Sequence, residues 1–83
     1  MPYISKDKRV KYLLILDHFP KIPDKGELEY CIFKLMKHYM SDKDARYNQL
    51  HDTVYAAQHC ADEFRRRFLD ERENKAIIEN GDI

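Results

Sequence analysis

The sequence predicts a small all-α domain whose longest helix associates with other copies of the chain. Its 83 residues include only two glycines and three prolines, while 36% of them are charged. Apolar residues recur at helical spacing, which favours helices over strands. The third quarter also carries an apolar seam, with alternating spacings of three and four, formed by Tyr47, Leu50, Val54, Ala57, Ala61, Phe64 and Phe68.

A capping residue and two prolines delimit the first predicted helix. Ser5 can cap a helix over residues 6–18, because a serine hydroxyl accepts a hydrogen bond from the first turn. Pro20 and Pro23 end this helix, since proline lacks the amide hydrogen that a helix interior needs. We expect its buried face to carry Val10, Leu13 and Leu14.

The second predicted helix covers residues 25–40. Asp24 and Glu27 form a variant of the capping box at its start. Ser41 and Asp44 then resemble a second start signal, which leaves a connection of only a few residues before the next helix. So short a connection predicts an antiparallel helix hairpin. The face that we expect to be apolar contains Leu28, Ile32, Leu35, Met36 and Tyr39.

The third predicted helix, over residues 42–72, is the long one. At 1.5 Å per residue it would run on the order of 45 Å, whereas a compact domain of this size is only about 30 Å across. A short turn over residues 74–79 follows, with Asn80 and Gly81 as its cap. We treat residues 1–83 as a single helical domain that forms a homo-oligomer. Its predicted interface consists of Leu50, Val54, Ala57, Ala61, Phe64 and Phe68.

The charge distribution excludes some classes of partner. The net charge is zero, with six Lys and Arg against three Asp and Glu in residues 1–26, and five against seven in residues 62–83. A protein that coats nucleic acid needs a net basic surface, so we expect no nucleic acid polymer as partner. No signal peptide and no apolar run of transmembrane length is found, which predicts a cytoplasmic protein. We expect Cys31 and Cys60 to be reduced thiols in a helical core.

The histidines do not have the spacing of a metal site. His18, His38, His51 and His59 lack the pattern that places two ligands on one helix face. The dipeptide His51-Asp52 resembles that of the histidine-aspartate metal phosphohydrolases, but such sites need more helices than this chain supplies. We therefore expect no metal, no cofactor and no enzymatic activity.

A basic run is the strongest candidate for a ligand site. Arg66 and Arg67, together with Lys75, could hold a phosphate or a carboxylate through charge-assisted hydrogen bonds. Tyr3 or Tyr47 could stack on a base. The alternative is an ordinary salt-bridged helix face, since acidic residues lie three or four positions from the arginines: Asp62, Glu63, Asp70 and Glu71.

The chain also resembles an uncharacterised family of small proteins from phages and prokaryotic genomes. The resemblance rests on the opening Met-Pro-Tyr-Ile, the closing Glu-Asn-Gly-Asp, and motifs between them that include Gly26-Glu27-Leu28 and Glu63-Phe64-x-Arg66-Arg67. The chain departs from the family pattern at His51, Tyr55 and Glu71-Arg72, where asparagine, glycine and Pro-Tyr are usual. The missing proline implies a longer third helix.

The resemblance implies a function in binding rather than in catalysis. Short phage proteins of this kind often act against host defence by binding alone. We therefore expect a counter-defence protein that captures an anionic, nucleotide-like ligand at a subunit interface. The alternative is an oligomeric regulator or inhibitor that binds a host or phage protein and takes no small ligand. If the protein is encoded by a phage, its compartment is the cytoplasm of the host cell.

Overall fold

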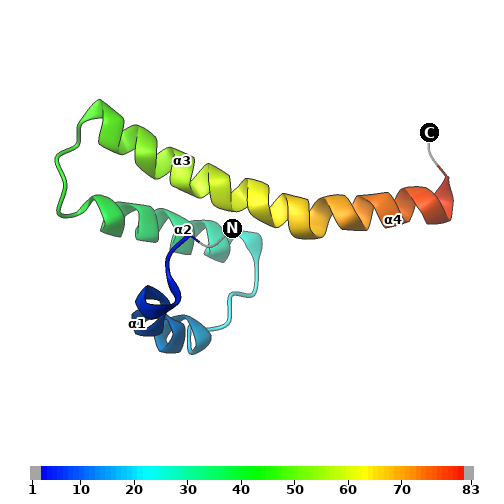
Figure 1. Ribbon diagram of the computed structural model, residues 1–83, viewed down its shortest axis with the longest axis horizontal. Helices are drawn as coiled ribbons and strands as arrows, with labels where there is room; N and C mark the ends of the chain where they lie inside the picture. Colours follow the sequence, from blue (N-terminus) through cyan, green and yellow to red (C-terminus); the bar gives the residue numbers. More distant parts are fainter. Residues whose placement is uncertain (1–2, 82–83) are drawn as a thin grey trace. The chain divides into compact units, whose positions relative to one another are not determined.

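The computed structural model describes residues 3–81, and every regular element in that range is helical (Figure 1). The helices are α1 (Lys6–Asp17), α2 (Lys25–Met40), α3 (Tyr47–Phe64) and α4 (Asp70–Asn80), with a π-helical segment, η1 (Arg65–Leu69), between the last two. The predicted all-α class is therefore confirmed. The outer residues of the two terminal motifs, Met1, Pro2 and Asp82, lie outside the described range, as does Ile83.

The chain divides into two compact units between Tyr30 and Cys31, inside α2. The first unit contains α1 and the beginning of α2. The second contains the rest of α2 together with α3, η1 and α4. The description of residues 1–83 as one domain stays a prediction.

In the first unit, α1 leaves its apolar residues exposed. Val10, Leu13 and Leu14 were expected to be buried, but all three side chains are largely accessible to solvent. Apolar residues run consecutively over residues 13–16, so they point to all sides of the helix rather than to one face. The Ser5 hydroxyl makes no capping hydrogen bond; only its backbone oxygen accepts bonds from the first turn of α1.

The start of α2 follows the sequence prediction. The Glu27 N–H donates to Oδ1 of Asp24 at 2.8 Å, which satisfies one of the backbone donors that a helix start leaves unpaired. Lys25 and Glu29 form an ion pair one turn apart. The hydrogen bond that Lys25 donates to this carboxylate, together with the negative charge of Glu29, raises the pKa of Lys25.

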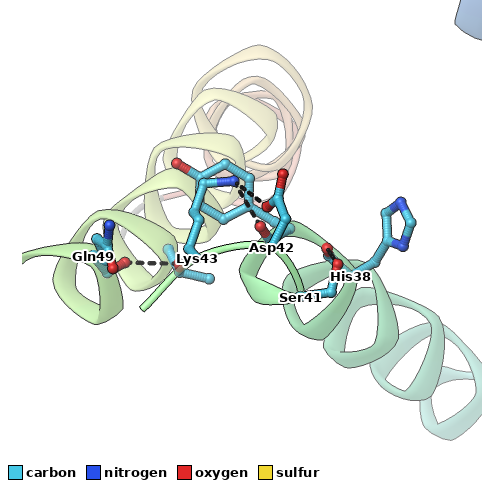
Figure 2. Close-up of polar contacts among 7 residues, drawn as sticks. His38, Ser41, Asp42, Lys43 and Gln49 are labelled. Carbon is cyan, nitrogen blue, oxygen red and sulfur yellow. Dashed lines mark hydrogen bonds and ion pairs between the residues drawn. The ribbon is translucent and has the colours of Figure 1, made fainter. Parts of the chain in front are cut away.

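The predicted start of the third helix was wrong. α3 begins at Tyr47 rather than at residue 42, because the polar side chains between α2 and α3 bond locally instead of capping a helix. The Ser41 hydroxyl donates back to the His38 carbonyl at 2.7 Å. The Lys43 ammonium donates to Oδ1 of Asp42 at 3.0 Å, as Figure 2 shows. Lys43 also donates to the backbone oxygen of Tyr39 at 2.8 Å.

The predicted end of that helix was also wrong, since helical structure continues through η1 and α4 to Asn80 (Figure 1). No proline interrupts residues 47–80. The Asp70 N–H donates to the carbonyl of Arg65, a π-helical bond that spans five residues. Gly81 closes α4 with a φ of 82°, a conformation that glycine adopts without strain.

The π-helical turn changes which apolar residues share a face. A strict heptad from Phe64 and Phe68 would continue to Ile78. One extra residue in the turn moves the face on by one position, from Phe68 to Leu69, so that Ile78 no longer continues it. Of the two isoleucines on α4, Ile77 is the less exposed, at 44% against 82% for Ile78. We define the apolar stripe as Leu50, Val54, Ala57, Ala61, Phe64, Phe68, Leu69 and Ile77.

Among the described residues, no hydrophobic side chain is buried. The only buried residue in that range is Thr53 on α3, whose hydroxyl donates to the Gln49 carbonyl at 2.9 Å. Cys60 is exposed and Cys31 half-buried, so the expectation that both cysteines lie in a core was wrong. A chain with so little internal packing leaves its apolar surface available for contacts with other chains.

Candidate functional site

The basic run lies at the junction of α3 and η1. Glu63 is the last residue but one of α3, and its carboxylate accepts hydrogen bonds from both Arg66 and Arg67. The nitrogen–oxygen distances are 2.7 Å for Nη2 of Arg66 and 2.5 Å for Nε of Arg67. The hydrogen bond from Arg66, and next that from Arg67, hold the pKa of Glu63 below its ordinary range. These contacts are those of a salt-bridged helix face.

The other predicted ligand residues belong to different elements of the structure. Lys75 lies on α4 and pairs with Glu71 at 3.7 Å. Tyr47 is the first residue of α3 and is 78% exposed. Tyr3 belongs to the first compact unit, whereas the other candidates belong to the second. Among the predicted ligand residues, Arg66 and Arg67 share Glu63 as a partner.

The predicted interface residues lie on the apolar stripe of α3 and η1. Leu50, Val54, Phe64 and Phe68 are each between 47% and 65% exposed. The rings of Phe64 and Phe68 contact each other, with their centroids 4.7 Å apart. The stripe is thus available for contact along its length, as an interface between chains requires.

A row of alternating tyrosine and histidine rings follows another side of α3. Tyr47, His51, Tyr55 and His59 are spaced four residues apart, so each ring lies one turn from the next. The centroid distances along the row are 4.2, 5.4 and 6.3 Å. The last pair, Tyr55 and His59, is stacked, with an angle of 17° between the ring planes. This row is a preformed stacking surface.

An open hollow of about 540 Å³ adjoins the end of this row. It is lined by Tyr39 from α2 and by Asp52, Tyr55, Ala56 and His59 from α3, all within the second unit. The hollow therefore combines two phenol rings, an imidazole, a methyl group and one carboxylate. None of the ion pairs among the described residues involves Asp52.

Sequence reasoning noted several of these residues but did not connect them. The spacing of four from Tyr47 to His59 was a readable signal for the ring row, because residues four apart lie on one helix face. The approach of Tyr39 to Asp52 had a weaker signal. It depends on the path of residues 41–46, which local side-chain bonds determine.

In residues 3–81, no three His, Cys, Asp or Glu side chains are grouped so that they could hold a metal ion. None of the described helices has the length and apolar character needed to cross a membrane. The candidate sites in this part of the chain are the paired arginines, the apolar stripe and the hollow.

The elements and sites described above define a small all-α protein with an exposed apolar stripe. Comparison with known families identifies it further: the chain belongs to the family described as a domain of unknown function (DUF6899), whose model matches residues 1–83. This match confirms the resemblance to an uncharacterised family. No curated protein and no solved structure is similar enough to the chain to count as a match.

Proposed function

We propose that this protein is a non-enzymatic binding protein that assembles into a homo-oligomer through its apolar stripe and, as an oligomer, binds another protein. In this proposal the ends of α2 and α3 form an antiparallel hairpin, and the stripe on α3, η1 and α4 is the interface. One observation carries the proposal. The described residues bury no hydrophobic side chain, although large apolar side chains are present on every α-helix.

Self-association changes the free energy of folding of this chain. A chain of about this size is only marginally stable even when it buries most of its apolar surface. Each apolar side chain removed from water contributes roughly 1.5–3 kcal/mol. A monomer with its stripe in water would forgo that contribution, whereas an oligomer recovers it at the interface. Association and folding are therefore coupled in this proposal.

Light scattering combined with size-exclusion chromatography tests the assembly. At micromolar concentration we expect the mass of a dimer or a larger oligomer, with helicity that rises with protein concentration. A monomeric mass together with concentration-independent helicity would remove the basis of the proposal. Pull-down from infected and uninfected cells would then identify the protein partner.

A second candidate function is capture of an anionic, nucleotide-like ligand at the subunit interface, as in counter-defence proteins of phages. What favours it is that Glu63 orients the guanidinium groups of Arg66 and Arg67 at one point of the helix. A phosphate is a ligand that paired guanidinium groups bind through charge-assisted hydrogen bonds. Tyr47 would supply a stacking surface in this proposal, with Lys75 and Tyr3 as further contacts.

Calorimetry against cyclic and linear nucleotides tests the second candidate. Binding should weaken as salt rises, because charge-assisted contacts at a surface are screened. Replacing Arg66 and Arg67 by glutamine should abolish binding, while the matched double replacement of Lys6 and Lys8 should not. If no nucleotide binds, or if both double variants behave alike, the arginines serve the helix only and protein contact remains the proposed function.

A further inference from the structure

The hollow between the end of α2 and α3 has the chemistry of a binding site for an organic cation. From this arrangement we infer that Tyr39, Asp52, Tyr55 and His59 bind an alkylammonium or guanidinium group. The inference goes beyond the proposed self-association, since all of the lining residues come from one chain. It also concerns a ligand of opposite charge to the nucleotide-like anion considered for the basic run.

The charge of the hollow comes from Asp52. On a helix, a carboxylate finds ion-pair partners three or four residues away. Those positions around Asp52 are Asn48, Gln49, Tyr55 and Ala56, none of which carries a charge. Within the described part of the chain, the carboxylate is therefore available to an external cation. An anionic ligand would be repelled from the same place.

The aromatic rings suit the same class of ligand. The face of a tyrosine ring attracts a cation because its π-electrons carry partial negative charge. Tyr39 demonstrates this property in the structure, since Nζ of Lys43 lies 3.9 Å from the centroid of its ring. The charge of Lys43 is balanced by Asp42 at 3.0 Å. Asp52 therefore remains the uncompensated charge among these groups.

The neighbouring rings hold the wall of the hollow in place. Tyr55 lies between two imidazoles, with centroid distances of 5.4 Å to His51 and 6.3 Å to His59. Such contacts restrict the rotamers of the rings before any ligand arrives, which reduces the entropy lost on binding. Ala56 also lines the hollow, and its methyl group is too small to fill the space between the rings. A flat guanidinium or a small alkylammonium fits this combination of apolar walls and one carboxylate.

Nuclear magnetic resonance titration of the full chain tests the inference. Ethylguanidinium is the probe, and ethylurea, which has nearly the same shape but no charge, is its matched control. We expect ethylguanidinium at millimolar concentration to shift the signals of the lining residues, and ethylurea to have no comparable effect. Equal responses to the two compounds would overturn the inference.

Variants of Asp52 and Tyr55 distinguish binding in the hollow from a general electrostatic effect of the protein surface. D52N should weaken ethylguanidinium binding by roughly two- to fivefold, the range expected for one exposed charge pair. D62N removes the same charge from α3 outside the hollow and should leave binding unchanged. Y55F keeps the ring and should bind, whereas Y55L should not. Circular dichroism of each variant verifies that its helices are intact. Equal effects of D52N and D62N, or full binding by Y55L, would contradict the proposed site.

Two sources could supply the cation, and a competition experiment distinguishes them. A blocked tripeptide with a central arginine represents the side chain of a protein partner, and ethylguanidinium represents a free small molecule. Tighter binding of the tripeptide supports the site with a basic side chain as its ligand. Tighter binding of ethylguanidinium supports it with a free metabolite instead. Light scattering on the same samples reports the oligomeric state separately, so a failure of this inference is distinguishable from a failure of self-association.

Discussion

Glu63 illustrates how a single residue can organise its neighbours on a helix. Its carboxylate is the shared acceptor of Arg66 and Arg67, and its side chain is less exposed than that of either arginine. The pairing keeps two long, flexible side chains in defined positions on η1. Either role proposed for the arginines, as part of the helix surface or as a phosphate site, starts from this arrangement.

The lowered pKa of Glu63 predicts how this pairing depends on pH. Because the pKa is lower in the folded state than its ordinary value of 4.5, the pairing stabilises the helix above pH 4.5. The contribution is lost as the pH falls through the lowered pKa. In thermal melts followed by circular dichroism, E63Q should melt below the wild type at pH 7, and the difference should disappear in acid. E73Q, whose carboxylate has no ion pair within the described residues, should show no such pattern.

At the scale of the elements, the two glycines differ in whether their backbone conformation tolerates a side chain. Gly26 lies in the first turn of α2, where a Cβ would approach Oδ1 of Asp24 only to an ordinary contact distance of 3.6 Å. Gly81 has a φ of +82° and nothing within 4 Å of the position of a Cβ. A side chain therefore fits at both positions, but only Gly81 has a backbone that opposes it.

These positions make a matched pair of substitutions. G26A should stabilise the protein by about 0.4–1 kcal/mol, because alanine restricts the unfolded chain more than glycine does. G81A should destabilise it by about 1–3 kcal/mol, the cost of a positive-φ, extended backbone that is essentially restricted to glycine. Urea unfolding followed by circular dichroism measures both changes. Shifts of the same sign for the two variants would contradict the backbone argument.

The same elements explain what the sequence could predict. The start of α2 was predictable because the Asp24 carboxylate reaches the Glu27 amide through a local bond. The start of α3 was not, because the side chains of Ser41 and Asp44 can either cap a helix or bond locally, and they bond to His38 and Arg46 instead. The ring row was readable from its spacing. The hollow was not, since it depends on where the turn places Tyr39.

At the scale of the whole molecule, the dominant feature is that residues 3–81 bury no hydrophobic side chain. Apolar residues were correctly assigned to helices, but the expectation that α1 buries Val10, Leu13 and Leu14 was wrong. Periodicity indicates which residues share a face and does not indicate what covers that face. The stripe and the apolar residues of α1 are both exposed to solvent. In the proposed function, association with other copies of the chain buries them.

A charge placed on the stripe should therefore disrupt the assembly. V54E would bury an unpaired carboxylate in the proposed interface, which is costly in an apolar environment. We expect the dissociation constant of the oligomer to rise at least tenfold, or about 1.4 kcal/mol, in analytical ultracentrifugation. I78E is the matched control, because Ile78 is equally apolar but lies off the stripe and is 82% exposed. Equal dissociation of both variants would mean that general hydrophobicity, rather than the stripe, holds the chains together. An intact V54E oligomer would place the interface on another surface.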